Sequence, residues 1–332
     1  MKNEIKFGVR ISRALATRDT SGFVKGIGVN RKPFDREIVI YPYEHVSWNA
    51  IKETVLEAEC LGYDLINISD HLMLGKERFE AWTLQSAIGA ITKKIRLGQT
   101  VLCYAYRGLP SIFAKQVATL DNITGGRLDI GMGCGYEKNE FEAYGLVFPA
   151  TKIRIAQLNE YLDILKLMWT ESIINYQGKY YNIKNARSEP KPIQKPYPPI
   201  MIGANRKLML RLAAKHANIV NFEKETADTI DVIKKRIRIL EEACDSIGRD
   251  PSEIIKSWGE WVVLFEDENE VKKMDSFIKM SPRTWCGLPE EYIERIKEYI
   301  EIGISYITPR FMDLPNKNSL KLFAEIVIPH FR

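Results

Sequence analysis

The sequence has few of the residues that support a disulfide scaffold, a metal site or a membrane span. Its five cysteines, Cys60, Cys103, Cys134, Cys244 and Cys286, are scattered, odd in number and form no C-x-x-C pair. This spacing argues against a disulfide framework and against structural zinc. The four histidines lie far apart without ligand spacing, so no metal is expected. No apolar stretch approaches the ~20 residues that cross a bilayer.

The net charge is also small. A formal charge of +5 over 332 residues, with acids and bases balanced along most of the chain, gives no reason to expect nucleic acid as a partner. The basic run Lys234-Lys235-Arg236 lies in a helical pattern and is interpreted as a solvated helix face. The region after Met1 is charged, so no signal peptide is expected and the cytoplasm is the expected compartment.

What the sequence does contain is a regular alternation of short apolar runs and longer helical patterns. Eight runs predict strands: Ile5–Val9, Leu65–Ile68, Ile95–Leu102, Arg127–Met132, Ile200–Ile202, Ile219–Phe222, Trp258–Phe265 and Tyr306–Thr308. Six patterns predict helices: Trp48–Leu61, Ile112–Asn122, Lys152–Thr170, Leu208–Lys215, Thr229–Ile247 and Glu290–Ile302. Continuous apolar strands indicate parallel pairing with both faces covered. The simplest α/β arrangement is a closed (β/α)8 TIM barrel, and a doubly wound sheet is the alternative.

Two segments interrupt this alternation. Residues 13–42 are polar, aperiodic and longer than a usual βα loop. Residues 172–199 contain a predicted hairpin around Tyr176–Tyr181, followed by five prolines. Both are interpreted as insertions over the barrel mouth, within a single domain that spans residues 1–332.

The segment from Phe113 to Leu146 is the most informative part of the chain. A predicted helix ends at Gly125-Gly126, and a short apolar strand then runs into Gly133-Cys134-Gly135. Glycine at the exit of a buried strand lets a flat ligand approach the backbone closely. Because ligands of α/β proteins bind at the carboxyl ends of the strands, the segment predicts a site there.

A carboxylate and an imidazole follow the second predicted strand directly. Asp70 and His71 come after Leu65–Ile68, so both would project into the barrel mouth. Histidine titrates near neutrality and can donate or accept a proton there. The alternative is that Asp70 caps the next segment and His71 is a structural histidine, and the dipeptide alone does not separate the two.

The fifth predicted strand suggests an anion site. It continues through Gly203 and Ala204 into a helix that starts near Asn205. Backbone N–H groups at a helix N-terminus bind phosphate, and Arg206 could add a charge-assisted contact. Equally, Asn205 could be an N-cap and Arg206 could face solvent.

Three motifs in combination are specific. They are Gly62-Tyr63-Asp64 before Ser69-Asp70-His71, Lys-Gln-x-Ala-Thr-Leu-Asp at 115–121 before Gly-Gly-Arg at 125–127, and Gly-Met-Gly-Cys-Gly at 131–135. With them the chain resembles the bacterial luciferase-like superfamily of (β/α)8 flavin and deazaflavin enzymes. It is most similar to the branch that uses coenzyme F420, which includes methylenetetrahydromethanopterin reductase and F420-dependent glucose-6-phosphate dehydrogenase. The resemblance covers about residues 46–222 and returns at 287–311.

The resemblance implies roles for individual residues. Asp70 and His71 match the pair beside the deazaflavin ring, with His71 as the acid/base. Thr100 and Val101 match the pair joined by a non-prolyl cis peptide that supports the ring. The other positions that line the cofactor are Gly133, Cys134, Gly135 and Asn139. At the phosphate end they are Gly203, Ala204, Asn205 and Arg206. The sequence also departs from the family. Tyr136 stands where the sugar-phosphate dehydrogenases have glutamate. No set of basic residues matches their sugar-phosphate clamp, although Lys224 lies in the corresponding region. Glucose 6-phosphate is therefore not the expected substrate, and Tyr136 and Lys224 are the candidate substrate residues.

The predicted activity is hydride transfer between F420 and a small organic substrate, such as an alcohol, an enone or imine, or a methylene-pterin. His71 would exchange the proton and Asp70 would orient it. Two alternatives stay open: an FMN-dependent monooxygenase supplied by a separate flavin reductase, and a non-catalytic flavin-binding barrel. The resemblance also implies a homodimer.

Overall fold

A computed structural model describes residues 4–11, 47–73, 78–223, 229–272 and 284–332. The predicted insertion at 13–42 and the candidate residue Lys224 lie outside these ranges. No helix among the described residues is long and apolar enough to cross a membrane.

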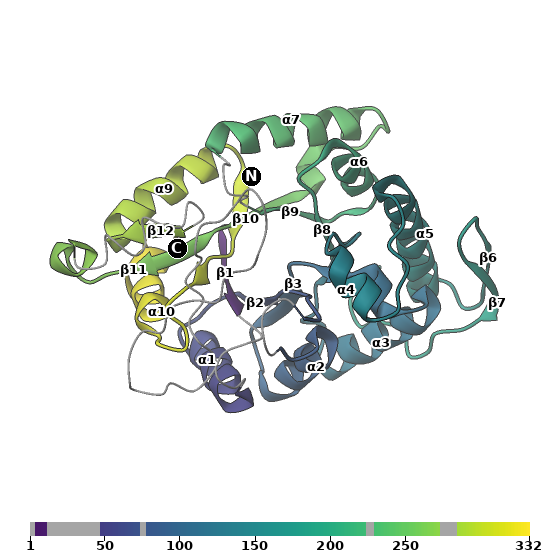
Figure 1. Ribbon diagram of the computed structural model, residues 1–332, viewed down its shortest axis with the longest axis horizontal. Coiled ribbons are helices and arrows are strands. Elements are labelled where there is room, and N and C mark those ends of the chain that lie inside the picture. The colour runs from purple at the N-terminus through teal and green to yellow at the C-terminus, as the bar shows by residue number, and fades with distance from the viewer. Residues whose placement is uncertain (1–3, 12–46, 74–77, 224–228, 273–283) are drawn as a thin grey trace.

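Parallel strands form the centre of the fold (Figure 1). They are β1 (Lys6–Ile11), β2 (Leu65–Ile68), β3 (Arg96–Gln99), β4 (Leu102–Cys103), β5 (Ile130–Gly133), β8 (Ile200–Gly203), β9 (Ile219–Glu223), β10 (Ile255–Gly259) and β13 (Ile304–Ile307). The strand order is β3-β2-β1-β13-β10-β9-β8-β5-β4, and every neighbouring pair is parallel. Because β3 and β4 are successive pieces of one run of chain and stand at opposite ends of this order, the sheet closes. The predicted (β/α)8 barrel is therefore confirmed, and the doubly wound alternative is wrong.

Helices surround the barrel on its outside, as Figure 1 shows. They are α1 (Trp48–Cys60), α2 (Ala81–Ile91), α3 (Pro110–Ile123), α5 (Thr151–Thr170), α6 (Lys207–His216), α7 (Ile230–Asp245) and α9 (Pro289–Glu301), and the chain closes with α10 (Asn318–Leu322) and short turns to Phe331. All six predicted helices are present. Helix α2 was not predicted, because its sequence AWTLQSAIGAI is apolar on most sides and lacks a polar face to mark the helical period.

The barrel interior changes character along its axis. Leu65, Met201, Ile219 and Tyr306 form a small apolar cluster of their own, separate from the large core that lies between strands and helices. Strand residues two positions further on point to the same side. The next inward layer toward the carboxyl ends is therefore polar, and it includes buried side chains at Asn67, Asn221 and Ser257.

Two predicted strands are wrong in their extent. The run Ile95–Leu102 is interrupted at Thr100–Val101 and forms β3 and β4 instead of one strand. The run Trp258–Phe265 is divided at Glu260 into β10 and β11 (Trp261–Leu264), and β11 pairs with β12 (Thr284–Gly287) and β14 (Arg310–Phe311) in a separate three-stranded sheet. The Glu260 carboxylate is buried and accepts hydrogen bonds of 2.5 and 3.0 Å from Arg295. This ion pair holds a charged side chain at a point where the apolar pattern predicted one continuous strand.

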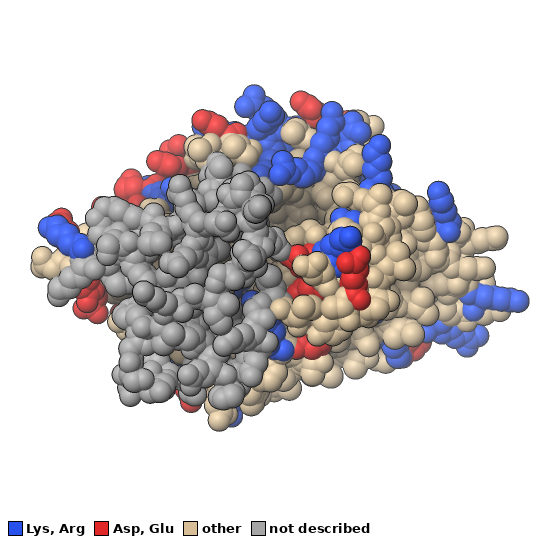
Figure 2. Space-filling model, in the orientation of Figure 1, with Lys and Arg blue, Asp and Glu red and all other residues tan. Residues whose placement is uncertain are grey.

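The predicted hairpin within 172–199 is present, but the predicted position of this segment over the barrel mouth is wrong, because Gln194 bonds Asp121 and the Leu128 carbonyl at the amino end of β5. Strands β6 (Ile174–Gln177) and β7 (Asn182–Ala186) pair antiparallel and project away from the barrel beside α5 in Figure 1. The basic run on α7 is mostly a solvated face, as predicted: Lys234 and Lys235 are exposed, and Figure 2 shows basic side chains above this helix. Arg236 is the exception, because it is buried.

Candidate active site at the barrel mouth

Val101 contacts two glycines, Gly133 and Gly203, at the carboxyl ends of β5 and β8. The Thr100–Val101 peptide bond, between β3 and β4, is cis, as the family resemblance implies. A Cβ placed at Gly133 on β5 would lie 2.6 Å from Val101 Cγ2, and one at Gly203 on β8 would lie 3.2 Å from it. Val101 is thus packed directly against the bare backbone of two neighbouring strands at the carboxyl end of the barrel.

The turn after β5 also requires glycine. Gly135 has φ 71°, a left-handed conformation that other residues rarely adopt. A Cβ there would lie 2.7 Å from Cys103 Sγ and 2.8 Å from the Phe141 ring. The chain therefore turns tightly over β4 before it enters the short helix α4 (Lys138–Ala143).

Asp70 is buried and tied to the neighbouring strand. One carboxylate oxygen accepts a 2.9 Å hydrogen bond from the backbone N–H of Cys103, and the other lies 3.5 Å from Arg107 Nη2. Arg107, in the 3-10 turn η1 (Tyr104–Arg107), also donates a 2.6 Å bond to Glu80. Burial disfavours the Glu80 charge, but Arg107 and the backbone N–H groups of Thr83 and Trp82 outweigh it and lower the pKa of Glu80 to about 2.

His71 is held at both ring nitrogens. Nδ1 lies 3.1 Å from Oε2 of Glu140 on α4, and Nε2 lies 3.1 Å from the Tyr136 hydroxyl. The His71 and Tyr136 rings meet edge to face, with 5.6 Å between centroids. The His71 side chain is 14% exposed, whereas Tyr136 is 67% exposed. The hydrogen-bonded series therefore runs from a buried carboxylate to a phenol at the open mouth.

Glu140 is the central acceptor of this group. Besides His71, it accepts a 2.9 Å bond from the Met73 backbone N–H and a 3.1 Å bond from the Tyr106 hydroxyl. Its side chain is only 2% exposed. Burial alone would raise its pKa, but the hydrogen bonds from His71, Met73 and Tyr106 lower the pKa of Glu140 to about 2. Burial and the neighbouring carboxylate raise the pKa of Tyr106.

Buried polar atoms lie on the inner surface just below the mouth. Asn67, Asn221 and Ser257 are at most 2% exposed. The Asn67 amide oxygen and nitrogen, the Asn221 amide nitrogen and the Ser257 hydroxyl have no hydrogen-bond partner among the described residues, and the same holds for the Thr100 hydroxyl. Such groups are ordinarily satisfied by protein, water or ligand.

The residues predicted at the phosphate end lie just before α6 and differ in exposure. Ala204 is buried, Asn205 is half-buried and Arg206 is exposed. Helix α6 starts at Lys207 with Arg206 as its N-cap, so the alternative of an Asn205 N-cap is wrong. Asn139 is exposed on α4, and Cys134 is half-buried with its thiol pKa raised by burial.

Glu140, Tyr106 and Arg107 were not predicted as site residues from the sequence. The one available signal for Glu140 was its position next to Asn139 in a motif-like loop.

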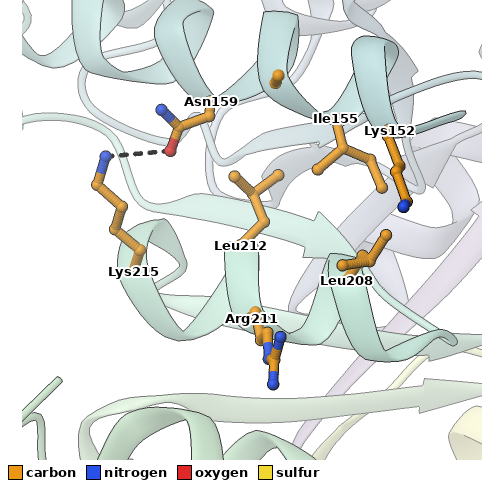
Figure 3. Close-up of a pocket in the computed structure, with 8 residues that line it drawn as sticks. Lys152, Ile155, Asn159, Leu208, Arg211, Leu212 and Lys215 are labelled. Carbon is orange, nitrogen blue, oxygen red and sulfur yellow. Dashed lines mark hydrogen bonds between the residues drawn. The ribbon is translucent and has the colours of Figure 1, made fainter. Parts of the chain in front are cut away.

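A groove of about 300 Å³ lies elsewhere, outside the barrel between α5 and α6, where Lys152, Leu208 and Lys215 line it (Figure 3). It contains none of the predicted site residues. No group of three or more His, Cys, Asp or Glu side chains in the described ranges could hold a metal.

These features suit a flat ring bound at the mouth. The Val101 side chain occupies the space beside Gly133 and Gly203 where their side chains would otherwise stand, so this cradle of three residues has no bulky side chain on β5 or β8. The polar atoms of Asn67 and Asn221 lie in the inward layer beneath it. A ring cradle beside a histidine is the arrangement of a barrel oxidoreductase.

Comparison with known proteins agrees with this class. Residues 36–274 match the luciferase-like monooxygenase family, and the chain belongs to this family. An F420-dependent glucose-6-phosphate dehydrogenase of Nakamurella multipartita is 27% identical over 85% of this chain and 92% of its own. Two solved structures superpose with TM-scores of 0.76 at 19% identity, covering 99% of this chain and all of theirs: an F420-dependent secondary alcohol dehydrogenase in complex with an F420-acetone adduct, and the monooxygenase RslO1 from Streptomyces bottropensis.

Proposed function

We propose that the protein is an F420-dependent oxidoreductase that transfers hydride between the deazaflavin and a small organic substrate. The observation that carries this proposal is the cradle of Val101, Gly133 and Gly203 beside the hydrogen-bonded His71. The F420-dependent relatives at 23–27% identity favour the deazaflavin over FMN. When bound, the deazaflavin supplies a hydride carrier that is nearly inert to oxygen.

The residues of this chain would divide the remaining work. Val101 and the two glycines support one face of the ring, together with Thr100, Cys134 and Gly135 at its edge. Asp70 is fixed by the Cys103 N–H and by Arg107, so its charge stays at a constant place beside the ring. His71 exchanges the proton that accompanies hydride transfer, which is worth about 10²–10⁴-fold in rate for a well-placed acid or base.

The predicted phosphate contacts belong to the same proposal. Ala204, Asn205 and Arg206 precede α6, whose first N–H groups point toward the mouth end of the barrel. Asn139 on α4 is exposed and would meet the cofactor only at its outer end. Tyr136 would contact the substrate.

The deciding experiment is a binding titration. Apo-protein is titrated separately with F420 and with FMN, and quenching of protein fluorescence is recorded. Saturable binding of F420, followed by turnover with a panel of secondary alcohols and enones, supports the proposal. Tight binding of FMN with none of F420 would overturn it.

Two other functions are outcomes of the same experiment. An FMN-dependent monooxygenase is favoured by the structural match to RslO1; it would bind FMN and consume oxygen when a flavin reductase is added. A non-catalytic barrel would bind a cofactor and turn over no member of the panel.

A further inference from the structure

Both ring nitrogens of His71 already have a hydrogen-bonding neighbour. In the described structure, His71 has Glu140 at Nδ1 and Tyr136 at Nε2, each at 3.1 Å. A substrate that approached Nε2 would have to displace the Tyr136 hydroxyl. Tyr136 itself is largely exposed, and it stands on the loop that follows β5, at the rim of the mouth.

The donors and acceptors in this series have a definite direction. Glu140 accepts from Met73 N–H and Tyr106 O–H as well as from His71, which is the behaviour of an ionised carboxylate. His71 must therefore donate from Nδ1. In the tautomer with the proton on Nδ1, Nε2 carries the lone pair, and the Tyr136 hydroxyl at 3.1 Å is placed to donate to it.

We propose that Tyr136 is the catalytic acid/base that touches the substrate oxygen, that His71 takes up and returns its proton, and that Glu140 is the positioning residue that fixes the His71 tautomer. The inference rests on the proposed function and requires a substrate with a hydroxyl or carbonyl oxygen that the Tyr136 hydroxyl can meet. A phenol in a hydrogen-bonded series suits an uncharged substrate hydroxyl.

The transfer balances without a further reactant. In the oxidative direction the alcohol O–H proton passes to the Tyr136 oxygen as the Tyr136 proton passes to Nε2. The bound deazaflavin would supply the acceptor for the C–H electron pair, so the C=O bond forms without another oxidant. His71 becomes an imidazolium between Tyr136 and the Glu140 carboxylate, and it releases its proton after the ketone leaves. Ketone reduction is the reverse.

The first test reads the hydrogen bonds without turnover. ¹⁵N-histidine-labelled apo-protein is observed by NMR, with His71 assigned from the His71→Ala spectrum. The wild type should show His71 with the proton on Nδ1 and Nε2 as a hydrogen-bonded acceptor. Tyr136→Phe should keep the Nδ1–H tautomer but shift Nε2 to the position of an acceptor without a strong donor. Glu140→Gln should remove the preference for one tautomer.

The surroundings of His71 also contain Asp70, Tyr106 and Arg107, so matched controls are needed. Tyr144→Phe removes an exposed phenol at the end of α4, and Glu142→Gln removes an exposed carboxylate on the same helix. Both should leave the His71 signals unchanged. If Tyr136→Phe also leaves the Nε2 signal unchanged, the proposed hydrogen bond does not exist in solution and the inference is wrong.

The second test is kinetic, with F420 and 2-propanol as the probe. Tyr136→Phe should lower kcat by about 100-fold or more, with F420 affinity unchanged, and should remove one limb of the pH–rate profile. A Tyr136→Phe enzyme with wild-type kcat on 2-propanol overturns the inference while the proposed function stands. Failure of the wild type to bind F420, with the NMR result as expected, overturns the proposed function but keeps the hydrogen-bonded series.

Discussion

Glu140 should make a pH-dependent contribution to stability. Its pKa falls from 4.5 to about 2 in the folded protein. At ~1.36 kcal/mol for each unit, the folded state gains about 3 kcal/mol from the ionised carboxylate. Because the folded pKa is the lower one, this stabilisation is present above about pH 4.5 and is lost as the pH falls toward 2. About half of it should be gone near pH 3.

The measurement is urea unfolding followed by tryptophan fluorescence, for the wild type, Glu140→Gln and the control Glu142→Gln. At about pH 7, Glu140→Gln should lower the free energy of unfolding by up to about 3 kcal/mol, since glutamine keeps one acceptor oxygen but cannot satisfy three donors. The urea m-value should not change, because the surface exposed on unfolding is the same. Glu142→Gln should have little effect, because exposed ion pairs contribute at most about 1 kcal/mol.

Comparing the two pH values separates charge from packing. The gap between wild type and Glu140→Gln should shrink by about half between pH 7 and pH 3. An equal gap at both values would show that the side chain stabilises the protein through packing alone. No gap at either value would show that its three hydrogen bonds do not persist in solution.

Four further substitutions test the mouth and the barrel. Gly133→Ala should weaken F420 binding about tenfold or more, and Gly203→Ala less, because the added Cβ meets Val101 at 2.6 Å in one case and 3.2 Å in the other; fluorescence titration measures both. His71→Ala should keep cofactor binding and lose most turnover, as a steady-state assay would show. Gly131→Ala should reduce the soluble yield or the Tm, because its Cβ would overlap the backbone oxygen of Gln99 at 1.8 Å.

The barrel was predictable because its strands are encoded locally. Each strand is a short apolar run between helical patterns. Because the strands are buried on both faces, few polar residues interrupt the apolar pattern that predicts them. The failure at Trp258–Phe265 has a tertiary cause. Glu260 looks like a minor interruption in the sequence, and its role depends on Arg295 on helix α9, 35 positions away, which forms the ion pair with it.

The candidate site was predictable only in part, for the same reason. Asp70 and His71 follow a strand directly, so local reading places them at the mouth. Their roles at the mouth stay a prediction. The carboxylate at His71 Nδ1 is Glu140, 69 positions along the chain, and no local pattern distinguishes it from its exposed neighbour Asn139. Only the return of α4 over the end of β2 brings Glu140 against Met73 and His71.

Both partners of His71 come from one short segment, which gives the departure at position 136 a physical meaning. The turn at Gly135, closed against Cys103 and Phe141, sets Tyr136 on one side of the ring and Glu140 on the other. A carboxylate at position 136, as in the sugar-phosphate dehydrogenases that the chain resembles, would place an acceptor-only group at Nε2. The Tyr136 hydroxyl can both donate and accept at the same nitrogen. The single change therefore places at Nε2 a group that can pass a proton in either direction.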